Sequence, residues 1–139
     1  MAYGEFMRFL TPGGYQTFRY YRNASQVEAI DIDRQVHPCT VSYAGKRKLV
    51  RLRLSNGEQL LCQPGDFIMV CPEEDPKGKG GAEPNVKAEH AKGRCLKTFS
   101  GASISVVSVE DAGVQHCYTY VHGGPKRSWG IVEDIIVKL

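Results

Sequence analysis

A hairpin signal in the middle of the sequence limits the fold more than any other feature. Residues 49–54, LVRLRL, alternate apolar and basic side chains, which is the pattern of a strand with one buried face. The Asn-Gly pair of SNGE follows directly, and this dipeptide favours the tight turn of a β-hairpin. Residues 59–63, QLLCQ, form the predicted returning strand, which Pro64 and Gly65 end. This part of the chain therefore predicts an antiparallel sheet.

Short strand patterns separated by turn residues fill most of the remaining chain. MRFLT and YQTFRYY flank a Pro-Gly-Gly turn, and the further predicted strands are DFIMV, RCLKTF, ISVVSVED, CYTYV and IVEDIIVKL, with AGVQ separating ISVVSVED from CYTYV. VKAEHAKG has a weak helical pattern, and residues 72–86, rich in Pro, Gly and charge, are predicted to be a loop or an insertion scar. We therefore predict an all-β chain of many short strands with at most one short helix.

Length and composition narrow the class of protein. The 139 residues suit one domain, spanning 1–139, rather than two. The longest apolar runs, such as FIMV, are far shorter than a membrane helix, and no charged and apolar leader opens the sequence, so we expect neither membrane insertion nor secretion. The basic excess, 18 Lys and Arg against 15 Asp and Glu, is too small to indicate nucleic-acid binding.

The five cysteines have the spacing of neither a disulfide scaffold nor a zinc site, because none of them forms a C-x-x-C pair. Free cysteine is among the most buried residue types, so we predict reduced thiols that pack as small apolar side chains in a reducing compartment. Cys117 is excluded from this prediction. We expect no metal and no cofactor.

Taken in order, the segments resemble the Hint fold of inteins and Hedgehog autoprocessing domains. YGEFMRFLTPGGYQTF is similar to the opening intein block, and VSYAGKRKLVRLRLSNGEQLLCQPGDFIMV to the second. VKAEHAKGRCLKTF resembles the segment that follows, and ISVVSVEDAGVQHCYTYV and WGIVEDIIVKL resemble the two closing blocks. The likeness covers nearly the whole chain at mini-intein length, and the order of the segments makes it specific.

The resemblance implies a horseshoe of two pseudo-symmetric halves whose termini meet in one cleft. It also implies protein splicing, with the flanking extein segments as partners in cis, or a complementary fragment if the chain is split. We expect a monomer in the cytoplasm of a bacterial or phage-infected cell. An endonuclease or a split point would lie in residues 72–86 or near residues 99–103.

The resemblance assigns the first catalytic positions to residues that differ from those of most inteins. The position of the first-residue nucleophile corresponds to Ala2, which has no nucleophilic atom. Ala2 is either a natural variant or a change made to trap an unreacted precursor. The T-x-x-H motif falls on Gln63 and Asp66. Gln63 can donate two N–H bonds, and Asp66 can act as a base or hold a backbone N–H. Neither replaces an imidazole that gives up a proton near neutral pH.

The remaining positions lie in the two closing blocks. Inteins carry Asp or Cys in the first of these, and that position falls on Cys117 in one register and on Thr119 in another. Some inteins without a first-residue nucleophile begin with a Cys here, so Cys117 is the candidate to start the reaction, although a thiol packed in the sheet is an equal alternative. Lys138 and Leu139 fall on the terminal His-Asn pair, or that pair lies beyond them. His116 and His122 are possible substitute bases, but we expect surface loop histidines.

The sequence supports three functions. The leading hypothesis is a protein-splicing element in an inactive or atypical form. The alternative is a Hint-like domain that has lost its chemistry and acts as a binding module. The third is a small phage-type binder that uses the basic strand GKRKLVRLR, although the alternation of that strand indicates a solvated face. The splicing hypothesis predicts that the candidate residues converge: Ala2, Gln63, Asp66, Cys117 and the C-terminal residues.

Overall fold

The computed structural model describes residues 1–22, 26–71, 84–125 and 128–139 and consists almost entirely of antiparallel strands. The first sheet has the order β4 (Val27–Ile30), β5 (Val36–Leu54), β6 (Gln59–Cys62), β1 (Tyr3–Gly4), β10 (Ile104–His122) and β9 (Cys95–Leu96), and β5 also pairs with β10. The second has the order β3 (Gly14–Thr17), β2 (Arg8–Thr11), β11 (Trp129–Val132), β12 (Ile135–Lys138), β7 (Phe67–Met69) and β8 (Asn85–Lys87). The predicted all-β class is confirmed.

The predicted central hairpin is present. β5 and β6 pair from Val50 opposite Cys62 to Arg53 opposite Gln59. Gly57 lies in the connecting turn with φ of +87°, which glycine adopts without steric cost. The predicted loop at residues 72–86 lies mostly outside the described residues, although its last part forms the start of β8.

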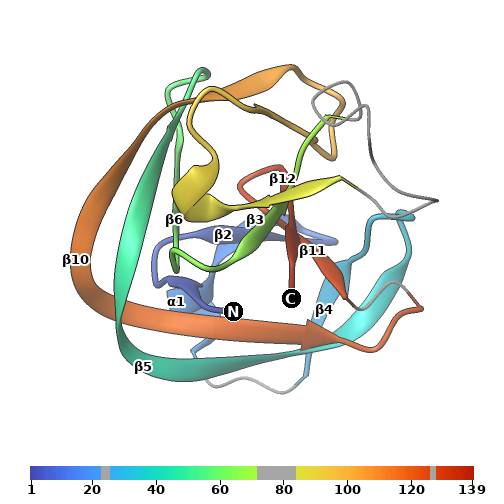
Figure 1. The fold of residues 1–139 in the computed structure, drawn as a ribbon. Coiled ribbons are helices and arrows are strands. Elements are labelled where there is room, and N and C mark those ends of the chain that lie inside the picture. The colour runs from blue at the N-terminus through green and yellow to red at the C-terminus, as the bar shows by residue number, and fades with distance from the viewer. Residues whose placement is uncertain (23–25, 72–83, 126–127) are drawn as a thin grey trace.

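The two longest strands are longer than the sequence patterns predict. β10 runs through AGVQ without a break, so the prediction of two separate strands is wrong there. Irregular pairing with β5 absorbs the turn signal: the register shifts between Asp111 and Gly113, and Gly113 has φ of +72°. β5 and β10 curve side by side around the outside of the molecule (Figure 1).

Two further predictions needed correction. The strand expected for YQTFRYY ends at Thr17, and Phe18–Tyr21 form the short helix α1, whose first turn is capped by the Thr17 hydroxyl accepting the Tyr20 N–H at 3.2 Å. IVEDIIVKL is not one strand but the tight hairpin of β11 and β12. Its turn residues Glu133 and Asp134 have φ of 51° and 67°, so no glycine announces the turn in the sequence.

The prediction that the cysteines are reduced holds for only part of the set. Cys71 and Cys95 form a disulfide, whereas the free thiols are Cys39, Cys62 and Cys117, all buried. The two half-cystines are far apart in the sequence, and only the pairing of the folded chain brings their Cα atoms to 5.6 Å.

A stacked aromatic cluster joins the two sheets in the core. The ring of Phe9 in β2 lies 5.0 Å from that of Phe18 in α1 and 5.1 Å from that of Tyr120 in β10. Tyr3 of β1 stacks on Phe18 at 6.1 Å. Rings of this size remove much apolar surface from water, so the cluster fixes β1 in the interior. None of the helices in the described residues has the length and apolar character needed to cross a membrane.

Candidate functional site

The first strand lies in the middle of a sheet, between two strands that each carry a free cysteine. Tyr3 pairs with Cys62 of β6 on one side, and Gly4 pairs with Cys117 of β10 on the other. Ala2, directly before β1, is fully buried. A side chain at Gly4 would crowd Leu61, because its Cβ would lie 3.1 Å from the Leu61 Cβ. The close packing at Gly4 thus holds β1 between the two strands that carry these thiols.

The corner after β6 turns the Asp66 carboxylate inward. The Asp66 N–H donates to the Gln63 carbonyl at 3.0 Å, and the Gln63 N–H donates to Asp66 Oδ2 at 2.9 Å, so the loop closes on itself. The backbone N–H of Ala2 also stabilises this carboxylate. Asp66, which is 3% exposed, therefore faces the nitrogen of the peptide bond that joins Met1 and Ala2.

Burial changes the acidity of this carboxyl group. It raises the pKa of Asp66 to about 6, and the backbone N–H groups of Gln63 and Ala2, together with the charges of the amino terminus and Arg47, only partly oppose the rise. A carboxyl that titrates there exchanges protons close to neutral pH. Sequence reasoning reserved this property for an imidazole, because the burial of Asp66 is visible only in the folded chain.

Cys117 lies next to the same corner as a protonated thiol. It is fully buried, and its Sγ donates to the Gln115 carbonyl at 3.2 Å. Burial raises the pKa of Cys117, and the backbone N–H and positive charge of Arg47 partly oppose this, while the charges of Asp66 and Glu5 add to it. The thiol therefore needs a proton acceptor before it can attack as a thiolate.

Arg47 connects the two candidates, and sequence reasoning missed it. Its Nη1 donates to Gln63 Oε1 at 3.2 Å, and its backbone N–H and charge act on Cys117. The side chain of Gln63 is thus directed to Arg47, while its backbone holds Asp66. In the sequence, Arg47 is one of several basic residues in GKRKLVRLR, and nothing distinguishes it from them.

The C-terminal strand ends beside the first strand, as Figure 1 shows. The Tyr3 hydroxyl donates to the Lys138 carbonyl at 3.0 Å. The Lys138 side chain is exposed, with its Nζ 5.6 Å from the ring centre of Phe67, the residue after Asp66. The Leu139 N–H donates to the Ser128 carbonyl at 2.8 Å. The backbone at both ends of the chain therefore meets near the Asp66 corner.

The comparisons with known proteins agree with this geometry. No protein-family model matches the sequence, and no curated protein matches it either. Among solved structures, the gp41-1 intein superposes with a TM-score of 0.75 at 12% identity, over 99% of this chain and 98% of that chain. A DnaB intein from Synechocystis sp. PCC 6803 gives 0.72 at 15% identity, over 99% and 96% of the two chains. The MchDnaB-1 intein gives 0.69 at 9% identity, over 99% of each.

This chain has the Hint fold of an intein. Both sheets, the long β5–β10 ribbon and the meeting of the two ends belong to a structure that matches inteins from end to end. At these identities the likeness establishes the fold, whereas the chemistry has to be argued from the residues present.

Thr119 of β10 is the second residue that the resemblance assigned to the first closing block. It is half-buried and pairs with Ser42, while its neighbours Tyr118 and Tyr120 point into the core. Within the described ranges its side chain makes no hydrogen bond or ion pair. The alternative register that assigned Thr119 to the site thus leaves it without a contact there.

The two histidines are strand residues rather than loop residues, and that expectation was wrong. His116 is exposed and its Nδ1 lies 2.7 Å from the Tyr43 hydroxyl. His122 is buried at 2% exposure, its Nε2 lies 2.9 Å from the Trp129 carbonyl oxygen, and its Nδ1 accepts the Gly124 N–H at 3.2 Å. His122 is therefore occupied by backbone contacts.

The basic strand of the intein fold is a solvated face. Its charged side chains pair with acidic side chains of the same chain. Arg53 Nε donates to Glu110 Oε1 at 2.8 Å, Arg51 lies 3.8 Å from the same carboxylate, and Lys48 lies 3.9 Å from Asp111. The hydrogen bond from Arg53 lowers the pKa of Glu110. No group of three or more His, Cys, Asp or Glu in the described part of the chain is placed to hold a metal ion.

Proposed function

We propose that this chain is a protein-splicing element of atypical chemistry, which acts in cis on the peptide bond between Met1 and Ala2. In this proposal Cys117 is the nucleophile and Asp66 moves the proton. The observation that carries it is the contact between the buried Asp66 carboxylate and the backbone N–H of Ala2, the nitrogen that must leave. The position of Cys117 opposite Gly4 on the neighbouring strand supports its role.

The proposed step balances within the described residues. The Cys117 thiol gives its proton to the Asp66 carboxylate, and its sulfur forms a bond to the carbonyl carbon of Met1. The bond from that carbon to the Ala2 nitrogen breaks, and the carboxylic acid of Asp66 returns the proton to this nitrogen. The products are a thioester on Cys117 and a free amino group on Ala2.

The next step differs from that of inteins with a terminal Asn. Neither Lys138 nor Leu139 carries a side-chain amide that can cyclise, so residues 1–139 by themselves take the proposed reaction to the thioester, which water or an added thiol opens. The expected outcome is therefore release of the segment before Ala2. We propose that a monomer carries out this reaction in the cytoplasm. That compartment keeps the three free thiols reduced.

A fusion with a tag before Met1 and a second tag after Leu139 tests the proposal. We expect the upstream tag to be released with the mass of a thioester when a small thiol is added. Cys117→Ala should abolish release, and Asp66→Asn should slow it by about 100-fold, the usual contribution of a proton donor. Cys39→Ser is the matched control, because this buried thiol lies in the same sheet at the far end of β5 and should leave the rate unchanged.

A second fusion separates loss of chemistry from loss of fold. Ala2→Cys with His-Asn-Cys added after Leu139 restores the nucleophile and the cyclising residue, so joined tags would show that the fold supports splicing. If the unsubstituted junction stays intact even with strong thiols, Cys117 is not a nucleophile and the proposal fails.

One observation favours a binding module as the second candidate. An open groove of about 400 Å³ lies between α1 and the β5–β10 ribbon, beside Cys117, and its lining combines aromatic and charged side chains: Glu5, Arg19, Arg22, Tyr43, His116 and Tyr118. Such a mixed lining suits an extended peptide with acidic side chains. An uncleaved junction together with saturable binding of such a peptide, lost in Arg22→Ala, would establish this function instead.

A further inference from the structure

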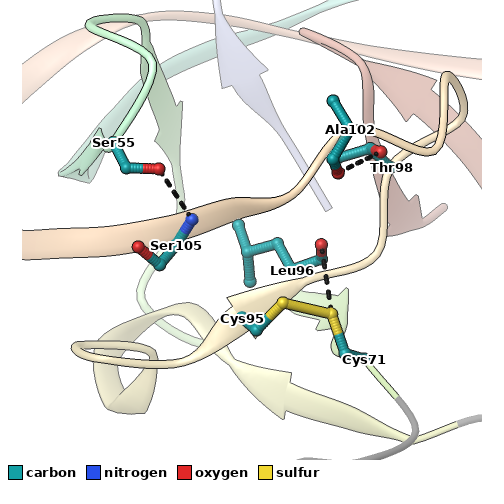
Figure 2. Close-up of a disulfide and its surroundings, with 7 residues drawn as sticks. All are labelled: Ser55, Cys71, Cys95, Leu96, Thr98, Ala102 and Ser105. Atoms are coloured by element: carbon teal, nitrogen blue, oxygen red, sulfur yellow. Dashed lines mark hydrogen bonds between the residues drawn. A yellow bond between two sulfur atoms is a disulfide. The ribbon is translucent and has the colours of Figure 1, made fainter.

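The disulfide joins two segments that pack against each other near the Asp66 corner. Cys71 follows β7 and Cys95 begins β9, and Figure 2 shows the bond between these two segments, with Ser105 of β10 beside Cys95. The Cys71 N–H donates to the Cys95 carbonyl at 2.9 Å, and Val70 bridges to Leu96. The covalent bond therefore reinforces a short backbone pairing.

The segment that ends at this disulfide forms backbone hydrogen bonds to the Asp66 corner. We name residues 84–96 the clamp segment; it contains β8, the one-turn helix η2 (Ala88–His90) and β9. Its Ala88 N–H donates to the Asp66 carbonyl at 2.8 Å, and its Glu89 N–H donates to the Pro64 carbonyl at 3.0 Å. The side chain of Ala88 is fully buried. These contacts fix the backbone that turns the Asp66 carboxylate towards Ala2.

Both ends of the clamp segment are fastened to the strand that leaves the corner. The carbonyl of Pro84 accepts the Val70 N–H at 3.0 Å at one end. At the other end, Cys95 is bonded to Cys71. At the first end this hydrogen bond extends the antiparallel pairing of β8 with β7, and at the second end β9 also pairs with β10. The disulfide is the covalent one among these restraints, and it is the one that a reductant can remove.

We propose that the Cys71–Cys95 disulfide is a redox-modification site that keeps the clamp segment on the Asp66 corner and releases it on reduction by a dithiol. In this step the thiolate of the dithiol attacks one sulfur and expels the other cysteine as a thiolate, which leaves a mixed disulfide. The second thiol of the dithiol then attacks that mixed disulfide and expels the remaining cysteine. The cystine gains two electrons and two protons and becomes two thiols, while the dithiol is oxidised to its own disulfide. The effect of this step on cleavage rests on the function proposed above.

The burial of the cysteines makes the reaction selective. Cys71 and Cys95 are half-buried, whereas the free thiols of Cys39, Cys62 and Cys117 are at most 2% exposed. Thiol–disulfide exchange needs access to the sulfur atoms. A dithiol therefore reaches the clamp without first reaching the thiol proposed as the nucleophile.

Amide hydrogen exchange on the whole chain, without flanking tags, tests the inference independently of any cleavage. Alkylation in denaturant and mass measurement first establish the thiol count before and after dithiothreitol. In the reduced protein we expect exchange at the Ala88 and Glu89 amides to be faster by about tenfold or more, since their hydrogen bonds then open locally. Amides of the β5–β6 hairpin should keep their protection.

Two variants complete the design. Cys71→Ser should show the fast exchange in both redox states, and Cys39→Ser should respond to dithiothreitol like the unsubstituted chain. Equal protection at Ala88 and Glu89 in both redox states would overturn the inference, as would recovery of all five cysteines as free thiols before reduction. An uncleaved junction with redox-dependent exchange would refute only the proposed function, and cleavage with equal exchange would refute only the clamp.

Discussion

Two aspartates are buried in the described part of the chain, and their surroundings give them opposite chemistry. Asp31 is 1% exposed and Asp66 is 3% exposed. Asp31 accepts the N–H groups of Asp33 and Gln35 at 2.8 and 2.9 Å, and its other oxygen lies 2.7 Å from His37 Nε2. Burial alone would raise the pKa of Asp31, but these hydrogen bonds outweigh it, and the pKa is lowered. Asp66 has fewer donors, and burial prevails.

The comparison separates a structural carboxylate from a reactive one. Asp31 accepts three hydrogen bonds that tie the β4–β5 turn, and protonation of the carboxylate would weaken them. Asp66 keeps part of its acceptor capacity unused beside the nitrogen of a peptide bond. Both side chains are shielded from water, but Asp66 lies deeper in the molecule and accepts fewer hydrogen bonds. These two differences together raise the pKa of Asp66 and lower that of Asp31.

The largest expected effect comes from removing each carboxylate in turn. Asp31→Ala should lower the free energy of unfolding by about 4 kcal/mol, because it leaves two backbone N–H groups and His37 without their partner. Asp66→Ala also leaves two backbone N–H groups unpaired, but it removes a carboxyl whose ionised form is costly to bury, so the net loss should be only about 1 kcal/mol. Cleavage of the tagged fusion should show the reverse order. Urea denaturation with both variants checks this, and equal losses of stability would remove the distinction.

A second experiment concerns the Cys71–Cys95 disulfide, which restrains the segment packed against the Asp66 corner. The Asp31 turn has no such bond. The disulfide spans 24 positions of the chain, and closing a loop of this size stabilises a protein by about 3 kcal/mol. Reduction should therefore lower the free energy of unfolding by about that amount. The difference between oxidising and reducing buffer should vanish in Cys71→Ser and persist in Cys39→Ser.

The two carboxylates should also give stability opposite dependences on pH. The folded-state pKa of Asp66 is raised to about 6, so its ionisation is costly in the folded chain, and stability should fall by about 2 kcal/mol between about pH 4 and about pH 7 relative to Asp66→Asn. The folded-state pKa of Asp31 is lowered, so its contribution is present above the unfolded pKa and is lost as the pH falls. Relative to Asp31→Asn, stability should therefore rise with pH below about pH 4 and change little above it. Slopes of the same sign would contradict the comparison.

The smallest effect concerns Arg47, which acts on the site through its neighbours. Arg47→Met should raise the pKa of the Cys117 thiol and release Gln63, and it should slow cleavage by less than about tenfold. The pH profile of cleavage should shift to higher pH, which a purely structural role would not cause. Lys46→Met, an exposed neighbour on the same strand, should change neither the rate nor the profile.

Much of the fold was predictable because its signals are local. The alternation of residues 49–54 and the Asn-Gly pair predicted the central hairpin correctly. The turn at Glu133 and Asp134 was missed, because residues that seldom adopt positive φ form it. At AGVQ the opposite error occurred: a break between two strands was predicted, but the pairing with β5 overrides the turn signal and β10 continues through it.

The candidate site was predictable in position but not in chemistry. The resemblance pointed to Gln63 and Asp66, yet the acidity of Asp66 depends on burial, which comes from the packing of distant segments. The role of Arg47 and the Cys71–Cys95 bond likewise depend on tertiary contacts. No spacing rule for adjacent cysteines detects partners that only a sheet brings together.

The position of β1 has a consequence for the timing of synthesis. Tyr3 leaves the ribosome well before its neighbours in the folded chain, which are Cys62, Tyr118 and the carbonyl of Lys138. The strand β1 therefore stays unpaired in the nascent chain until the β11–β12 hairpin has been translated, because contacts over such sequence distances form late. The peptide bond before Ala2 thus meets its reactive neighbours only after the later segments of this domain have been translated.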